Sequence, residues 1–161
     1  MILAATGHRP PKLGGYGDSV RLGLRTLAVR HFLDARPSQI ISGMALGWDQ
    51  AVAEAAIELC VPFIAAVPFE GQENRWPVES QRRYRQLIAA AAAAEIISPY
   101  PGARAMQQRN EWMVDRADRI VALWDGTWGG TFNCIEYANR VRVPVDNLWS
   151  RWKNDLSALL D

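Results

Sequence analysis

The feature that most constrains the fold is a regular alternation of short apolar runs with longer segments of helical character. Runs of strand length occupy residues 2–6, 39–42, 63–67, 95–98 and 119–123, with a weaker run at 144–148. Helices are predicted over residues 18–36, 48–60, 78–94, 104–117, 131–141 and 149–160. This pattern predicts an α/β fold for residues 1–161: a single domain with one doubly wound, mostly parallel Rossmann-like sheet and helices on both faces. Because the sixth run begins with Pro144, we expect it at a sheet edge.

Three glycine-containing segments each follow a predicted strand and precede a predicted helix. They are Thr6–Arg9, Ser42–Asp49 and Gly129–Thr131. In a parallel sheet, the strand ends that feed helices share one edge, where backbone N–H groups and helix N-termini can bind an anion. The sequence therefore predicts a pocket for a nucleotide-type ligand at the C-terminal edge of the sheet.

The segment Ser42–Asp49 contains two glycines and one acidic residue. Glycine lets backbone N–H groups approach a ligand, although strand-to-helix turns also use glycine for purely structural reasons. Asp49 either caps the following helix or accepts a hydrogen bond from a ribose hydroxyl. Because a carboxylate repels a phosphate, we expect the sugar or base near Asp49 and the phosphate elsewhere.

The segment Gly129–Thr131 is better suited to a phosphate. Its two glycines free the backbone, and the Thr131 hydroxyl can either cap the helix or bind a ligand oxygen. No acidic residue follows in the first helical turn, because Glu136 lies further along. The helix dipole is therefore unopposed and favours an anion.

Two arginines and one histidine are candidates for contact with the ligand. Arg109 shares a helical stripe with Met106 and Met113, so its guanidinium needs either an anionic partner or a route to solvent. Arg9 is a second candidate for binding phosphate. His8 beside it is either a general acid or base, or a structural residue.

The loop after the third predicted strand contains Gln72 and Trp76. These side chains can contact a base by hydrogen bonding and stacking if the loop lies at the same edge of the sheet. The alternative is a polar surface loop held in place by one buried aromatic side chain.

Composition argues against several classes of protein. The net charge of +1 gives no bulk attraction to DNA or to an acidic membrane. Cys60 and Cys134 form no metal-ligand or disulfide pattern, so we expect no metal and no bound cofactor. No apolar run approaches the length of about 18 residues that a membrane helix needs. The first apolar run is too short for a signal peptide, so a cytoplasmic location is expected.

Taken together, these motifs resemble the SLOG superfamily, the Rossmann-like group that includes DprA/SMF proteins, LOG phosphoribohydrolases and small YpsA-like proteins. The YpsA-like, DprA-related proteins are the most similar. The matching pieces are TGHRP at 6–10, SGMALGWD at 42–49, Pro68-Phe69 with Gln72 and Trp76, RN at 109–110 with MVD at 113–115, and WDG at 124–126 with GGT at 129–131. The resemblance and the motifs predict a nucleotide or nucleotide-derived ligand bound by Gly7, His8, Arg9, Ser42, Gly43, Met44, Asp49, Gln72, Trp76, Arg109, Asn110, Gly129, Gly130 and Thr131.

The resemblance leaves three functions open. We favour a sensor or ligand-binding protein. The first alternative is a LOG-like nucleoside-monophosphate phosphoribohydrolase, whose PGGxGTxxE motif carries a catalytic glutamate. Cys134 stands at that position, which leaves Asp49 and Glu136 as candidate catalytic residues and the question of catalysis open. The second alternative is a DprA-like module that binds single-stranded DNA through arginines and tryptophans.

The last predicted helix carries Trp149 and Trp152. SLOG proteins often self-associate, and these two side chains either form an apolar contact surface between copies or cover the edge of the sheet. A homo-oligomer is therefore one of the expectations for this chain.

Overall fold

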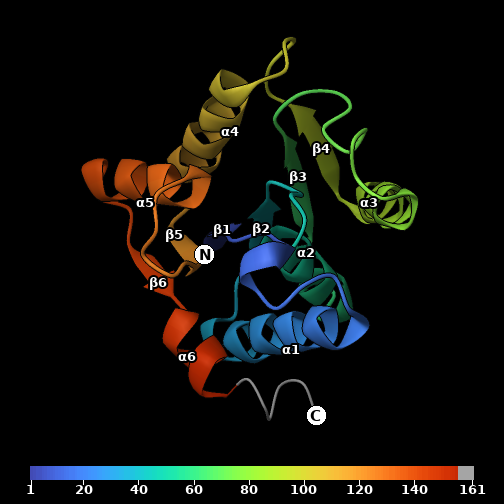
Figure 1. Ribbon diagram of the computed structural model, residues 1–161. Helices are drawn as coiled ribbons and strands as arrows, with labels where there is room; N and C mark the ends of the chain where they lie inside the picture. Colours follow the sequence, from blue (N-terminus) through green and yellow to red (C-terminus); the bar gives the residue numbers. More distant parts are fainter. Residues whose placement is uncertain (156–161) are drawn as a thin grey trace.

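The computed structural model describes residues 1–155 and shows a six-stranded parallel sheet with helices on both faces (Figure 1). This confirms the predicted α/β class. A short 3₁₀ helix covers Pro10–Lys12. The strands are β1 (Ile2–Gly7), β2 (Gln39–Ser42), β3 (Phe63–Val67), β4 (Ala93–Ile96), β5 (Arg119–Leu123) and β6 (Val145–Asn147). The helices are α1 (Asp18–Ala35), α2 (Trp48–Glu58), α3 (Val78–Ala90), α4 (Ala103–Arg116), α5 (Gly130–Arg140) and α6 (Trp149–Asn154).

The strand order places a topological switch point beside the first strand. The order across the sheet is β4-β3-β2-β1-β5-β6, and every pair is parallel. Leu3 of β1 pairs with Ile40 of β2 on one side and with Arg119 of β5 on the other. The chain thus builds outward in both directions from β1, and such a reversal opens a crevice at the carboxyl ends of the two strands. As Pro144 predicts, β6 lies at an edge.

Two apolar cores hold the helices against the sheet. Helices α1, α2, α3 and α6 enclose the larger core on one face, which contains the fully buried side chains of Trp48 and Phe32. Helices α4 and α5 pack on the other face around Met113, Val114 and Ile120 (Figure 1). Because β1 has apolar residues buried on both of its faces, its sequence appears as a continuous apolar run.

The alanine run at 89–94 corrects one predicted boundary. The sequence predicts a helix to residue 94 and a strand over 95–98, but α3 ends at Ala90 and β4 covers Ala93–Ile96. Ala91 is already extended, and the N–H of Ala92 donates to the carbonyl of Phe63 at 2.9 Å. The helix propensity of alanine is worth only a few tenths of a kcal/mol per residue over other good helix formers. Pairing with β3 outweighs it.

The last helix does not present the predicted contact surface. Trp152 is 2% exposed and belongs to the larger core, and Trp149 is partly buried against that core. The prediction that these two side chains form an apolar contact surface between copies is therefore wrong. Both side chains pack against the interior instead. The predicted continuation of the helix over 156–160 lies outside the described residues.

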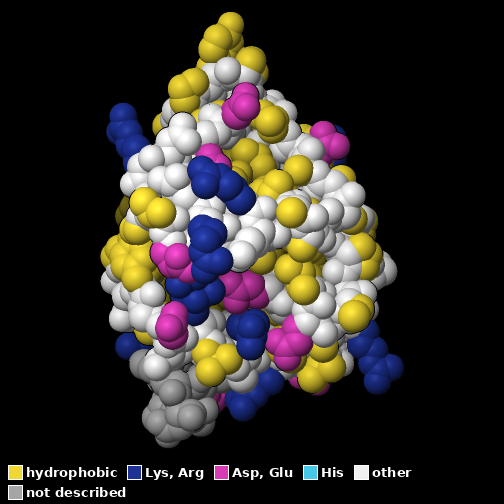
Figure 2. All heavy atoms as spheres, turned by 90° about the vertical axis from the view of Figure 1, so that its right-hand side faces the viewer, with side chains coloured by type: hydrophobic (Ala, Val, Ile, Leu, Met, Phe, Trp, Pro, Cys, Tyr) yellow, Lys and Arg dark blue, Asp and Glu magenta, His cyan; other side chains and the backbone are white. Residues whose placement is uncertain are grey.

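The face that carries α3 displays many charged side chains, and they alternate in sign (Figure 2). Some arginines of α1 and α3 form ion pairs: Arg21 with Glu54 at 3.2 Å, Arg25 with Glu58 at 3.2 Å, and Arg82 with Glu79. These arginines are therefore neutralised locally. Within residues 1–155, no helix combines the length and the apolar character needed to cross a bilayer.

Candidate functional site

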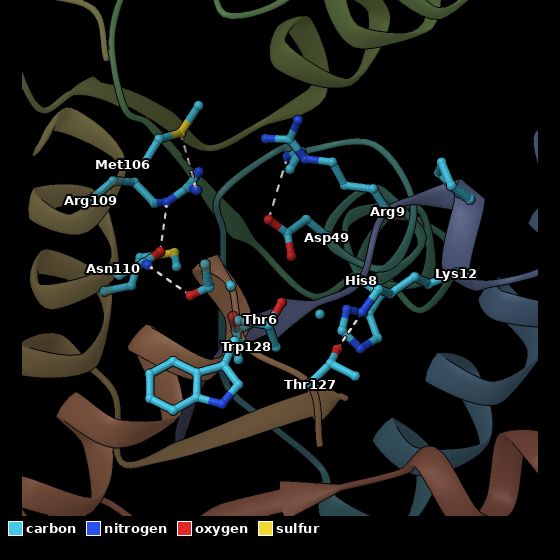
Figure 3. Close-up of a pocket in the computed structure, with 17 residues that line it drawn as sticks. Thr6, His8, Arg9, Lys12, Asp49, Met106, Arg109, Asn110, Thr127 and Trp128 are labelled. Carbon is cyan, nitrogen blue, oxygen red and sulfur yellow. Dashed lines mark hydrogen bonds between the residues drawn. The ribbon is translucent and has the colours of Figure 1, made fainter. Parts of the chain in front are cut away.

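A cavity of about 340 Å³ lies at the switch point, where the loops after β1 and β5 meet the start of α5 and the inner face of α4 (Figure 3). Its lining combines backbone from glycine-rich turns with cationic, acidic and apolar side chains. The lining residues are Thr6, Gly7, His8, Arg9, Pro11, Lys12, Ala45, Asp49, Met106, Arg109, Asn110, Met113, Thr127, Trp128, Gly129, Gly130 and Thr131.

The N-terminus of α5 opens into this cavity without a side-chain cap. Gly129 is the N-cap residue, and neither it nor Thr131 makes a capping hydrogen bond, so the capping role considered for Thr131 is not observed. The first turn contains no acidic residue. The first N–H groups of a helix have no partner within the helix, and the dipole concentrates positive potential around them. Gly129 and Gly130 are exposed, and a methyl group added to either would contact nothing within 4 Å.

Three cationic side chains line the same cavity from different elements. Arg9 follows β1 and is exposed, whereas Lys12 lies at the end of the 3₁₀ helix and contacts Thr127 in the loop after β5. Arg109 of α4 is 6% exposed and donates to the carbonyl of Gly43 at 2.7 Å and to the side chain of Asn110 at 3.2 Å. Asn110 in turn donates to the carbonyl of Gly130 at 3.3 Å. This chain of hydrogen bonds fixes α4 to the start of α5.

Gly43 lies between the buried guanidinium and the buried carboxylate of the site. A Cβ on Gly43 would lie 2.4 Å from Nη1 of Arg109 and 3.0 Å from Oδ2 of Asp49. Only glycine leaves room for both groups. Arg109 and Asp49 therefore interact electrostatically across the Gly43 backbone, without direct contact.

Asp49 is the one acidic residue that lines the cavity within residues 1–155. It is 5% exposed, Oδ2 accepts a hydrogen bond from the N–H of Ala45 at 3.4 Å, and Oδ1 is buried without a hydrogen-bond partner. Burial raises the pKa of Asp49 to about 6, although Arg109, the Ala45 N–H and Arg9 all favour the ionised form. Asp49 does not cap α2, because no side chain makes a capping bond at that helix. Its Oδ1 therefore lies buried with its hydrogen-bonding capacity unused.

His8 is held in place by the loop after β5. Its Nε2 lies 2.7 Å from Oδ1 of Asp125, and its ring packs edge-on against Trp149 with centroids 5.8 Å apart. Burial alone would raise the pKa of Asp125, but hydrogen bonds from Thr127 and His8 hold it well below its usual range. These contacts support the structural alternative for His8. The contact between His8 and Asp125 joins the two loops that border the cavity.

Five predicted ligand-binding residues do not line the cavity. Ser42 ties the turn together, because its hydroxyl donates to the carbonyl of Asp49 at 2.7 Å and accepts from the N–H of Met44 at 3.2 Å. Gly43 is the spacer described above. Gln72 donates to the carbonyl of Gly43 at 3.3 Å, and Trp76 packs edge-on against Tyr84. The alternative of a loop held by a buried aromatic therefore describes Gln72 and Trp76 better.

The two residues near the LOG-type position are not placed for catalysis. Cys134 is 1% exposed beneath the cavity, and burial raises the pKa of its thiol to about 11. Glu136 is exposed on α5 and does not line the cavity. Among the catalytic candidates, only Asp49 faces the cavity.

Several lining residues were not predicted from the sequence. Lys12 and Thr127 meet only because the 3₁₀ helix folds back on the loop after β5. Trp128 and Met106 border the cavity on the α5 and α4 sides (Figure 3). Trp128 directly precedes Gly129, and this position next to a predicted ligand-binding glycine is the sequence feature that could have identified Trp128 as a lining residue.

The fold and this cavity define a Rossmann-like protein whose candidate site lies at the switch point of a parallel sheet. The chain belongs to the YpsA family of SLOG proteins, because the family model YpsA, described as the YspA SLOG family, matches residues 3–140. An uncharacterised SPbeta prophage-derived protein of Bacillus subtilis, YoqJ, is 33% identical over 128 residues, which cover 69% of this chain and 74% of YoqJ.

Two solved structures share the fold at low sequence identity. DNA processing protein A (DprA) from Streptococcus pneumoniae gives a TM-score of 0.63 at 18% identity, over 89% of this chain and 48% of that one. DprA from Helicobacter pylori, described with a single-stranded DNA binding mode, gives a TM-score of 0.63 at 19% identity, over 90% of this chain and 63% of that one. This chain thus spans about half the length of the first DprA chain and less than two thirds of the second.

Proposed function

We propose that the cavity binds a nucleotide or nucleotide-derived small molecule, with a phosphate group at the N-terminus of α5. The observation that carries this proposal is the uncapped, acid-free N-terminus opening into the same cavity as Arg9 and Lys12. Backbone N–H groups, a helix dipole and two cationic side chains together provide the chemistry of an anion site, although Lys12 also lies 3.6 Å from a carboxylate oxygen of Asp125. The cavity volume of about 340 Å³ lies within the range of small-molecule sites, about 300–1,000 Å³.

The buried carboxylate of Asp49 favours a ligand that carries hydroxyl groups over a bare anion. Its Oδ1 is buried without a partner, and a sugar hydroxyl that displaced the surrounding side chains and reached it would relieve the cost of burying that polar atom. A carboxylate in the same cavity as an anion site disfavours a second phosphate next to it. The arrangement therefore fits a ligand with one anionic end and one hydroxyl-bearing end.

Cleavage of an N-glycosidic bond is the second candidate, and Asp49 is the observation that favours it. A carboxyl group with a pKa of about 6 can exchange a proton near neutral pH, as a general acid or base must. Base release from nucleoside monophosphates tests this candidate. Full activity of Asp49→Asn would exclude Asp49 from catalysis.

DNA binding receives less support from the surface charges. Arg21, Arg25 and Arg82 are paired with acidic side chains, and the chain as a whole has a net charge of +1. A groove that follows a nucleic-acid backbone needs an excess of unpaired cations. The observations favour a small ligand over a long polyanion.

Isothermal titration calorimetry with a panel of nucleoside monophosphates, cyclic nucleotides and ADP-ribose derivatives tests the proposal. The two lysines of the chain provide a matched pair, because Lys12 lines the cavity and Lys153 lies on α6. Lys12→Ala should weaken binding several-fold, with a loss that shrinks as salt is raised, whereas Lys153→Ala should have no effect. Failure of the wild type to bind any member of the panel, or equal effects of both substitutions, would contradict the proposal.

A further inference from the structure

Trp128 is an unusually exposed aromatic side chain at the rim of the cavity. Its exposed fraction is 84%, whereas Trp48 and Trp152 are 0% and 2% exposed. Single exposed apolar residues are common on protein surfaces. Trp128 differs from such residues because it lines the cavity and directly precedes the uncapped N-terminus of α5 (Figure 3).

The position of Trp128 is supported by its neighbours. Phe132, one turn along α5, packs against the indole with ring centroids 4.6 Å apart and a tilt of 41°. Trp124 packs against the same phenylalanine at 6.0 Å, and its indole N–H donates to the carbonyl of Thr127 at 2.7 Å. The backbone immediately before Trp128 is thus anchored by Trp124. One part of the indole is covered by Phe132, and the rest remains open to a ligand.

No other large aromatic side chain lines the cavity within residues 1–155. The remaining lining residues are glycines, polar and charged side chains, one histidine, two methionines, one alanine and one proline. Trp76, which the sequence suggested for stacking, packs instead against Tyr84 at 5.4 Å. If the ligand carries an aromatic base, Trp128 is the surface on which that base can stack.

We infer that Trp128 stacks on the base of the ligand and makes the site selective for nucleoside phosphates over sugar phosphates. This inference rests on the proposed function. A phosphate at the first N–H groups of α5 would lie close to Trp128, because Gly129 and Gly130 follow it in the chain. With the phosphate there and the sugar in the cavity, the base on C1′ of the sugar can turn toward the rim and reach the exposed part of the indole.

The inference is tested by comparing nucleoside 5′-monophosphates with ribose 5-phosphate, which lacks the base. Calorimetry on the wild type should show tighter binding of the monophosphates, by about 5- to 150-fold, the range of base–aromatic stacking. Trp128→Ala should remove this preference and leave the affinity for ribose 5-phosphate unchanged. Trp128→Phe should retain most of the preference. Tyr100→Ala is the matched control, because Tyr100 is 76% exposed and does not line the cavity.

Each alternative outcome has a definite meaning. Equal affinity of the wild type for monophosphates and ribose 5-phosphate, or an unchanged preference in Trp128→Ala, would overturn the inference and leave the proposed function intact. No binding of either compound would overturn the inference, and no binding of any member of the nucleotide panel would overturn the proposed function as well. If Trp128→Ala lost binding of a thymidine oligonucleotide but kept its preference for monophosphates, Trp128 would serve nucleic acid and the inference would be wrong.

Discussion

Replacing Asp49 with asparagine should stabilise the protein, and the gain should depend on pH. Asp49 is 5% exposed, and one of its oxygens has no hydrogen-bond partner. Keeping a carboxylate ionised in such a place costs free energy that asparagine, which carries no charge, does not incur. Above pH 6 the substitution should therefore raise the free energy of unfolding.

The size of the effect follows from the pKa of Asp49, which burial raises from 3.8 to about 6. A difference of about 2 in pKa corresponds to about 3 kcal/mol. Between these two pKa values the folded protein binds more protons at Asp49 than the unfolded chain does. The contribution of Asp49 to stability therefore falls as the pH rises from about 4 to 6, and it stays low above that range.

Urea denaturation followed by tryptophan fluorescence at pH 4 and pH 8 measures this effect. The advantage of Asp49→Asn over the wild type should be about 2 to 3 kcal/mol larger at pH 8 than at pH 4. The difference between the two pH values is the quantity to compare, because the buried amide of asparagine has hydrogen-bonding needs of its own at both. Asp34→Asn is the control, because Asp34 is exposed on α1. An advantage of the same size at both pH values would refute the reasoning.

Two further predictions concern glycines and cysteines. Gly7→Ala should lower the free energy of unfolding by about 1–3 kcal/mol, because the new Cβ would lie 2.5 Å from the fully buried ring of Trp48. Gly130→Ala should leave the urea midpoint nearly unchanged and still weaken nucleotide binding, because its Cβ would point into open space at the start of α5; equal loss of stability in both variants would contradict this. In a thiol-reagent titration of the native protein, exposed Cys60 should react and buried Cys134 should not, until denaturant is added. Rapid modification of both thiols would show that Cys134 is accessible.

The fold could be predicted from the sequence because local patterns determine most of it. Apolar runs such as Ile2–Thr6 become strands buried on both faces, and the helices between them set the parallel direction. The alanine run was the exception. Alanine favours a helix when considered alone, but Ala93 and Ala94 are close enough to β3 to pair with Ile64 and Ala65, and no local pattern reveals that partner.

The candidate site could be predicted only in part. The glycine-containing segments with Gly7 and Gly130 line the cavity. They follow β1 and β5, whose carboxyl ends lie beside the cavity at the switch point whatever the conformation of the loops. Gln72 follows β3, which is separated from the β1–β5 crevice by β2. Its side chain therefore does not reach the cavity and instead donates a hydrogen bond to the carbonyl of Gly43. Lys12 and Trp128 belong to loops, and their positions depend on contacts between segments far apart in the chain. Periodicity carries no information about such contacts.

The edge strand β4 has a consequence for the behaviour of the protein at high concentration. All four of its residues are exposed, and its outer side has no neighbouring strand within residues 1–155. An open edge of this kind is a template for intermolecular strand pairing, which natural proteins oppose with short length and charge. Glu95 is the only charged residue of β4. The resistance of this edge to aggregation therefore depends on one carboxylate and on a length of four residues.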